Sequence, residues 1–241
     1  MIILIALGAF IATFLGGLLA LKFKDKLHLI LGFSAGAVVG VVFFDLIPEA
    51  LDLTSDRLTS SQTLSIIALG FVVYMIVFRY FHAKSHSHDH DDGECCSPKG
   101  SLGAGSLSIH SFIDGLGIGL AFQVSTVVGV IVAVAVLVHD FSDGINTVGM
   151  ILKNNGDQKT ALKWLAMDSI APALGVLCST LFIVDDFGLG VTLAVFAGFF
   201  LYIGASDLLP ESHHNHPTKW TTVMSVAGIL VIYFAIKLAG I

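Results

Sequence analysis

The feature of this sequence that most limits its fold is a series of apolar runs, each about twenty residues long and separated by short polar stretches. A helix needs about 20 residues to cross the roughly 30 Å hydrocarbon core of a bilayer. The chain is 55% hydrophobic and 12% charged, whereas soluble domains carry about 25% charged residues. We therefore expect a membrane protein, and the composition excludes a water-soluble enzyme.

The runs predict eight membrane spans, at about residues 2–21, 28–52, 62–82, 104–123, 125–152, 160–183, 188–211 and 220–240. They show no strand periodicity and are too long for barrel strands, so we predict an all-α membrane protein. No positive residue precedes the first run and three lysines follow it, which favours a retained helix over a signal peptide. We expect a single transmembrane transporter domain over residues 1–241.

The distribution of lysine and arginine predicts the orientation. Of the twelve such residues, ten lie in connections that follow an odd number of crossings, and only Arg57 and Lys237 lie on the other side. Positive residues favour the cytoplasmic side, so we expect a multi-pass protein of the cell (inner) membrane with both termini outside. The loop at 83–103 is then cytoplasmic. A net charge of −6 gives no polybasic signal, so we expect no nucleic acid partner.

Two D-L-x-P-E segments occur near the ends of the second and seventh spans, at Asp45–Glu49 and Asp207–Glu211. With eight crossings, these two spans run in opposite directions. Corresponding segments in opposite orientation are typical of an inverted repeat. We therefore predict that helices 1–3 correspond to helices 6–8 around helices 4–5. The alternative is a chance match, because prolines often end helices.

A second pair of segments, His110–Gly115 and His139–Gly144, shares the pattern H-x-F-x-D-G. On a helix, residues four apart lie on the same face, so each segment presents one imidazole and one carboxylate together. Two such helices packed face to face would place two His and two Asp around one point, which is a ligand set for a divalent transition metal. Asp140 points about 100° away and is a candidate for a second site or for an entry step.

Acidic residues inside the predicted spans support this interpretation. An Asp near the middle of a membrane costs about 2.5–3.5 kcal/mol, and no Lys or Arg lies in the middle of a span. The compensating charge must come mainly from protons or bound cations. Protonated acids that pair with one another are the rival explanation. The acids concerned are Asp45, Asp114, Asp140, Asp143, Asp168 and Asp207.

These residues resemble the ZIP (Zrt-, Irt-like) family of divalent metal transporters, and the resemblance extends over essentially the whole chain. It implies eight transmembrane helices, outward termini, a His-rich cytoplasmic loop between helices 3 and 4, and metal-binding H-N-x-P-E-G motifs in helices 4 and 5. The two H-x-F-x-D-G segments fall on these motifs. The segments at Asp45 and Asp207 resemble the H-L-x-P-E ending of the family's second helix.

The chain departs from the family pattern at several positions. Ser111 replaces the usual Asn, and Ile113 and Ser142 replace the motif prolines. Both motif acids are Asp where Glu is common, so the site must be tighter or a water must supply a ligand. Many relatives carry a Glu before the proline of helix 6 that helps bridge a second metal. Ala171 has that place here, and Asp168, one turn earlier, is the candidate to substitute for it.

The loop between the third and fourth spans is rich in His and Asp. Such a tract is a weak, compositional signal for metal binding, and the alternative is a solvated linker. We expect it to act as a local metal trap on the cytoplasmic side. The full set of predicted metal ligands is His110, Asp114, His139, Asp140, Asp143, Asp45, Asp168, Asp207, Glu211, His86, His88 and His90.

From these residues and the resemblance we expect a transporter that moves zinc, or iron, manganese or cadmium, into the cytoplasm. The alternative is an intramembrane metal-dependent hydrolase, which needs a general base and an open coordination position. The H-E-x-x-H pattern of such enzymes does not occur in the sequence. We expect no catalytic cofactor, because the metal is the substrate. The expected partners are divalent ions and the bilayer, with a homodimer as an open alternative to a monomer.

Overall fold

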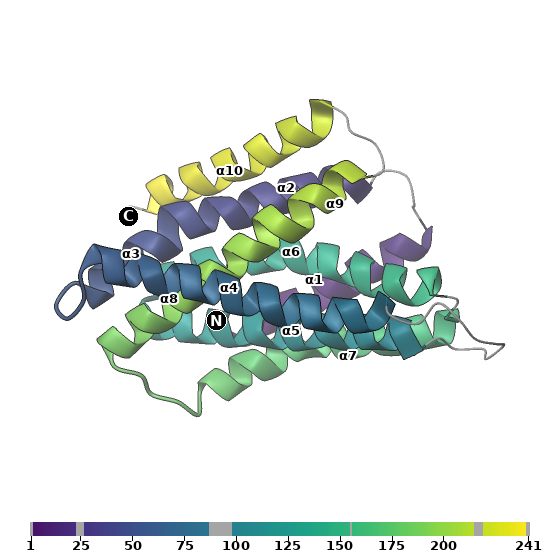
Figure 1. Cartoon of the computed structure of the whole chain (residues 1–241), viewed down its shortest axis with the longest axis horizontal. Helices are drawn as coiled ribbons and strands as arrows, with labels where there is room; N and C mark the ends of the chain where they lie inside the picture. Colours follow the sequence, from purple (N-terminus) through teal and green to yellow (C-terminus); the bar gives the residue numbers. More distant parts are fainter. Residues whose placement is uncertain (1, 23–26, 87–97, 155, 215–218, 240–241) are drawn as a thin grey trace.

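A computed structural model describes residues 2–22, 27–86, 98–154, 156–214 and 219–239 of the chain. These residues form helices joined by short turns, and no strand occurs among them. Eight helical segments are long and apolar enough to cross a membrane. The expected all-α fold with eight spans is therefore confirmed (Figure 1).

Six of the eight spans are single helices: α1 (Ile2–Lys22), α4 (Ser60–His86), α5 (Pro98–Val124), α6 (Thr126–Lys153), α7 (Gln158–Ser179) and α10 (Lys219–Ala239). The second span is divided into α2 (Leu27–Val41), a π-helical turn η1 (Val42–Leu46) and α3 (Ile47–Thr54). The seventh is divided in the same way into α8 (Asp186–Tyr202), η2 (Ile203–Leu208) and α9 (Leu209–His214). The inverted repeat itself stays a prediction.

The loop expected at 83–103 is shorter than predicted, because both of its ends are helical. Helix α4 continues to His86 and α5 begins at Pro98. Helices can extend beyond the hydrocarbon layer into water, where hydropathy no longer marks their ends. Proline is favoured in the first turn of a helix because the first N–H groups have no helical partner, which explains the start of α5.

The helices pack in two groups (Figure 1). Helices α1, α5, α6 and α7 pack on one another, and α2 packs on α10 while α3 and α4 pack on α8. The groups meet chiefly where α2 contacts α6 and where α5 contacts α4 and α8. Burial follows this arrangement: 72% of the most apolar segment of α6 is buried, but only 22% of that of α1 or α4. Helix α6 is thus the central helix.

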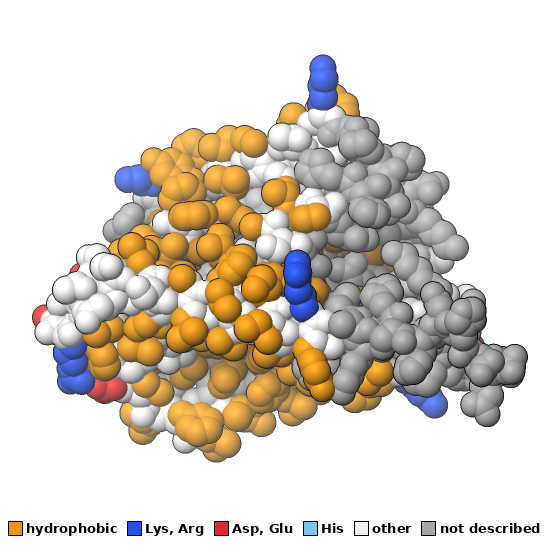
Figure 2. Space-filling view, in the orientation of Figure 1, with side chains coloured by type: hydrophobic (Ala, Val, Ile, Leu, Met, Phe, Trp, Pro, Cys, Tyr) orange, Lys and Arg blue, Asp and Glu red, His pale blue; other side chains and the backbone are white. Residues whose placement is uncertain are grey.

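The outer surface suits a bilayer. Figure 2 shows apolar side chains over most of the described face, with few charged side chains among them. Three turns meet at one end of the bundle: the Arg57 side chain lies 4.0 Å from Asp185, and Gln123 donates a hydrogen bond to the carbonyl oxygen of Ser179. These turns follow spans 2, 4 and 6, so the helices alternate in direction as a multi-pass membrane protein requires.

The glycines that end the two H-x-F-x-D-G segments fix the helices around the candidate site. A Cβ atom on Gly115 would overlap the backbone carbonyl oxygen of Pro172 in α7. A Cβ atom on Gly144 would overlap the carbonyl oxygen of Thr13 in α1. Small residues allow such close backbone approach in membrane bundles. Helix α7 therefore supports α5 from outside, and α1 supports α6.

Candidate metal centre

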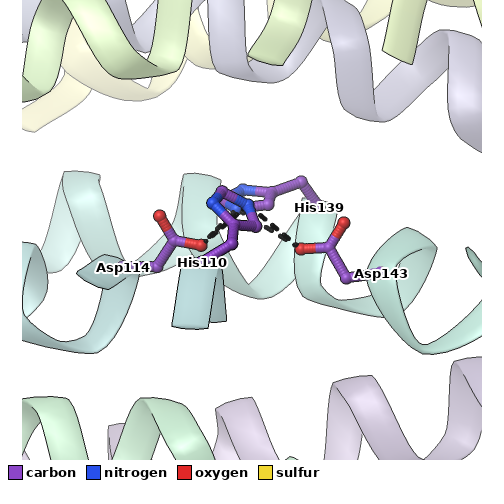
Figure 3. A group of neighbouring side chains, drawn as sticks. All are labelled: His110, Asp114, His139 and Asp143. Atoms are coloured by element: carbon purple, nitrogen blue, oxygen red, sulfur yellow. Dashed lines mark hydrogen bonds and ion pairs between the residues drawn. The ribbon is translucent and has the colours of Figure 1, made fainter. Parts of the chain in front are cut away.

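Four of the predicted ligands, His110, Asp114, His139 and Asp143, form one buried group between α5 and α6 (Figure 3). Each helix contributes one His and one Asp spaced four residues apart, as the helical period requires. In Figure 3 the two imidazoles lie next to each other, with a carboxylate on either side. All four residues are at most 6% exposed. The structure therefore brings the two motifs face to face.

The distances in this group are close to those of a four-coordinate metal site. Nε2 of His110 lies 3.1 Å from Oδ2 of Asp114 and 3.4 Å from Oδ2 of Asp143. Nε2 of His139 lies 3.1 Å and 3.9 Å from the same two oxygens. In a tetrahedral zinc site with ligands about 2.1 Å from the ion, the ligand atoms lie roughly 3.4 Å apart. The two Asp side chains are thus long enough to reach the group.

The hydrogen bond of His139 to the backbone fixes the state of its ring. Nδ1 of His139 lies 3.1 Å from the carbonyl oxygen of Ala135. A carbonyl oxygen only accepts, so Nδ1 carries the proton and a neutral ring has its lone pair on Nε2. This Nε2 faces Oδ2 of Asp114 at 3.1 Å. Two acceptors at this distance need a cation between them, either a proton or a metal ion.

Sequence reasoning missed one residue that touches this group. The hydroxyl of Tyr74 in α4 lies 3.0 Å from Nδ1 of His110. Tyr74 is 9% exposed, and its ring contacts the rings of Phe199 and Tyr202. A tyrosine in the middle of an apolar helix needs a partner for its hydroxyl, and this was the available signal. Tyr74 lies in α4, which packs with α8, whereas the four candidate ligands lie in the other group of helices, in α5 and α6.

Two further predicted residues, Asp140 and Asp45, are buried outside the group of four. Asp140 is fully buried, and neither of its carboxylate oxygens has a hydrogen-bond partner among the described residues. Asp45 lies in η1, and its Oδ2 likewise has no partner within the described part of the chain. Buried polar groups normally find partners, so each carboxyl group is suited to hold a proton or a cation.

Asp168 is held by two hydroxyl groups. Ser111 of α5 donates to its Oδ1 at 2.7 Å, and Thr147 of α6 donates to its Oδ2 at 2.7 Å. Its carboxylate therefore links three helices beside the group of four. Ser111, at the position of the family's Asn, takes part in this link. Ser142, at the position of a motif proline, donates to the hydroxyl of Ser34 in α2.

The side chains of the remaining predicted ligands are not described by the structure. The side chains of Asp207, Glu211 and His86 lie outside the described part of the structure, as do residues His88 and His90. Their roles stay predictions.

Comparison with known proteins agrees with this geometry. The family described as ZIP Zinc transporter matches residues 81–235. Zinc transporter ZupT of Corynebacterium aurimucosum is 24% identical over 246 residues, which cover 95% of this chain and 93% of that protein. Human Zinc transporter ZIP10 is 32% identical over 110 residues, which cover 44% of this chain. Zinc transporter foi of Drosophila melanogaster is 25% identical over 161 residues and 64% of this chain.

The relatives differ in length. The matched region is 13% of human ZIP10 and 23% of foi, whereas ZupT matches over nearly its full length. The match to the family includes both H-x-F-x-D-G segments and more than half of the chain. With its eight apolar helices and buried His/Asp group, the chain belongs to the ZIP zinc transporter family.

Proposed function

We propose that this protein carries a divalent metal ion, with zinc as the first candidate, through the membrane and into the cytoplasm. The ion would bind His110, Asp114, His139 and Asp143. The observation that carries the proposal is the convergence of these four buried side chains on one point, where Nε2 of His139 lies 3.1 Å from Oδ2 of Asp114 and a proton or a metal ion must lie between the two acceptors. The similar proteins described above are named as zinc transporters, which supports zinc as the substrate.

The charge of the group suits a divalent ion. Two carboxylates carry two negative charges and two neutral imidazoles carry none, so a bound divalent cation leaves the group neutral. A neutral complex reduces the cost of burying charge in a membrane. Protons compete with the metal for each ligand, so we expect metal binding to weaken as the pH falls.

The two groups of helices suggest how the ion changes sides. All four proposed ligands lie in α5 and α6, whereas Tyr74 reaches His110 from α4 in the other group. Alternating access commonly arises when one bundle moves against another around a fixed site. We propose that the ligand-bearing group moves relative to the group of α2, α3, α4, α8 and α10. The hydrogen bond between Tyr74 and His110 would then form in one state and break in the other.

The other buried acids are proposed as secondary positions. Asp140 has no hydrogen-bond partner among the described residues, so its carboxyl group is free to hold a second ion or a proton next to the site. Asp45 is proposed as a contact along the path of the ion. Asp168 would have to give up its bonds to Ser111 and Thr147 before it could bind a metal.

We propose that the loop between α4 and α5 changes the rate of transport but contributes no ligand that the ion needs in order to cross the membrane. Replacing His86, His88 and His90 with Ala should leave appreciable zinc uptake, because a tract outside the membrane changes the local metal concentration and not the site. Uptake is measured in cells with matched expression of the variant. Complete loss of uptake in a well-expressed variant would show that the loop belongs to the transport path.

A flux assay tests the whole proposal. The purified protein is placed in liposomes, and the entry of zinc, iron(II), manganese and cadmium is followed with the pH set separately on each side. We expect metal flux in the parent and almost none in His139→Ala. A peptidase assay on the same preparation tests the hydrolase alternative. Metal-dependent peptide cleavage without metal flux would replace transport by hydrolysis.

A further inference from the structure

An apolar groove lies between α5 and α7, on the outside of the bundle and apart from the metal centre. Its volume is about 500 Å³. Its walls include Ser108 and Phe112 of α5 and Trp164, Met167, Ile170 and Leu174 of α7. Met167, Ile170 and Leu174 are 57%, 47% and 53% exposed. The groove is therefore open to the lipid phase.

The length of the groove matches one leaflet of a bilayer. On α7 it runs from Trp164 to Leu174, which is about 15 Å at 1.5 Å per residue. Half of the roughly 30 Å hydrocarbon core is also about 15 Å. Tryptophan favours the membrane interface, so Trp164 fits the headgroup end and Leu174 the middle of the bilayer. A single extended acyl chain fits this length.

Two lysines continue the same face of α7 beyond the headgroup end of the groove. Lys159 and Lys163 precede Met167 by eight and four residues, so all three lie on one helical stripe. Both lysines are exposed, and side chains on a helix tilt toward its N-terminus, here toward the membrane surface. Asp157 caps this helix, and hydrogen bonds from Thr160 hold the pKa of Asp157 below its usual value. The two lysines outnumber this single carboxylate.

We propose that the groove binds an anionic phospholipid, with one acyl chain along the outer surface of α5 and α7 and the phosphate at Lys159 and Lys163. Charge complementarity favours this occupant over a second copy of the chain, which would have to cover two lysines at the end of an apolar surface. The lipid would contact Phe112, two residues from His110 on the same helix. It would therefore stabilise the contact between α5 and α7, and this binding does not depend on the metal.

Thermal unfolding of the full chain without metal tests the proposal. The protein in detergent is titrated with phosphatidylglycerol or with phosphatidylcholine of the same acyl chains. We expect phosphatidylglycerol to raise Tm more. The double variant Lys159→Gln/Lys163→Gln should need roughly thirtyfold more phosphatidylglycerol for the same shift, given the usual attraction of a lysine to an anionic membrane surface. Lys237→Gln, at the other end of the bundle, is the matched control and should behave as the parent.

A second variant tests the apolar part of the site. Ser108→Leu fills the groove, so it should reduce the shift caused by either lipid. Equal shifts with both lipids in the parent, or the same loss in Lys237→Gln, would overturn the proposal. An equal shift with inorganic phosphate alone would show that the acyl chain is not bound. Disulfide cross-linking of Met167→Cys between copies in liposomes would show that a second copy covers the groove instead.

Discussion

Replacing Asp143 with Asn should separate metal binding from folding. Oδ2 of Asp143 is buried and has no hydrogen-bond partner among the described residues, with the imidazole nitrogens at 3.4 and 3.9 Å. Asn keeps the shape of the side chain but removes its negative charge, and burying that charge near the middle of a membrane costs about 2.5–3.5 kcal/mol. The metal-free Asn variant should therefore be as stable as the parent, or more stable by up to about 3 kcal/mol.

The same substitution should remove most of the stabilisation by metal. At a free zinc concentration of about 1,000 times Kd, the parent gains about 4.1 kcal/mol. Loss of one partner of a buried charge pair costs about 3–5 kcal/mol, which is roughly a thousandfold in affinity. At the same zinc concentration the variant then gains only about 0.4 kcal/mol. Thermal unfolding of both proteins in detergent, with and without zinc, measures this difference.

Asp168→Asn is the matched control, since it also removes one buried carboxylate from the same region. Asp168 accepts hydroxyl bonds from Ser111 and Thr147 at 2.7 Å each. Hydrogen bonds to a charged group contribute about 1.5–3 kcal/mol, so this variant should lose stability of that order without metal and keep the zinc-induced gain. If Asp143→Asn instead loses stability and keeps the gain, Asp143 is a structural residue and the proposed ligand set is wrong. If Asp168→Asn loses the zinc-induced gain, Asp168 is a ligand.

Three further experiments test other features of the protein. Tyr74→Phe should weaken zinc binding about 10–100-fold in a titration, because it removes the hydroxyl that orients His110. The control Tyr233→Phe should bind zinc as the parent does. Equal zinc affinities of the two variants would show that Tyr74 is not part of the site. Gly144→Ala should lower Tm because its methyl group overlaps the backbone of α1. A Cβ atom on Gly149 would have no neighbour within 4 Å, so Gly149→Ala should keep or raise Tm. Equal effects of the Gly144 and Gly149 substitutions on Tm would contradict the close packing of α6 on α1. Protease added outside intact cells should not cut the loop at 83–103, and cleavage there would reverse the predicted orientation.

The grouping of the two His/Asp pairs could be predicted from the sequence because each pair depends on one helical period. His110 and Asp114 are four residues apart, as are His139 and Asp143, and the 3.6-residue period places each pair on one face. Charged and polar residues are rare inside apolar runs, and this indicated that the polar faces of the two helices meet. The contacts around them were not predictable in this way. Tyr74 and His110 are 36 residues apart, and Ser111 and Asp168 are 57 residues apart, so those contacts depend on how the helices pack.

The two prolines of the D-L-x-P-E segments show a second kind of feature that the sequence alone did not predict, a local change of helix type. Proline is unfavourable inside a helix, because it has no N–H and its ring clashes with the preceding turn, and the predicted second span includes Pro48. The structure shows instead that the helix widens into the π-helical η1 and then continues as α3 to Thr54. The wider turn accommodates the proline without ending the span. The same arrangement precedes Pro210, where η2 leads into α9.

The departures from the family motif fit together in this chain. With Ile113 and Ser142 in place of prolines, α5 and α6 run unbroken for 27 and 28 residues. An unbroken helix places residues i and i+4 about 6 Å apart, and a short Asp then reaches the imidazole one turn away: in α5 the two side chains meet at 3.1 Å. A longer Glu would have to fold back within a site whose residues are at most 6% exposed. The unbroken helices and the shorter acids therefore act together, because helical periodicity alone sets the spacing of the proposed ligands within each helix.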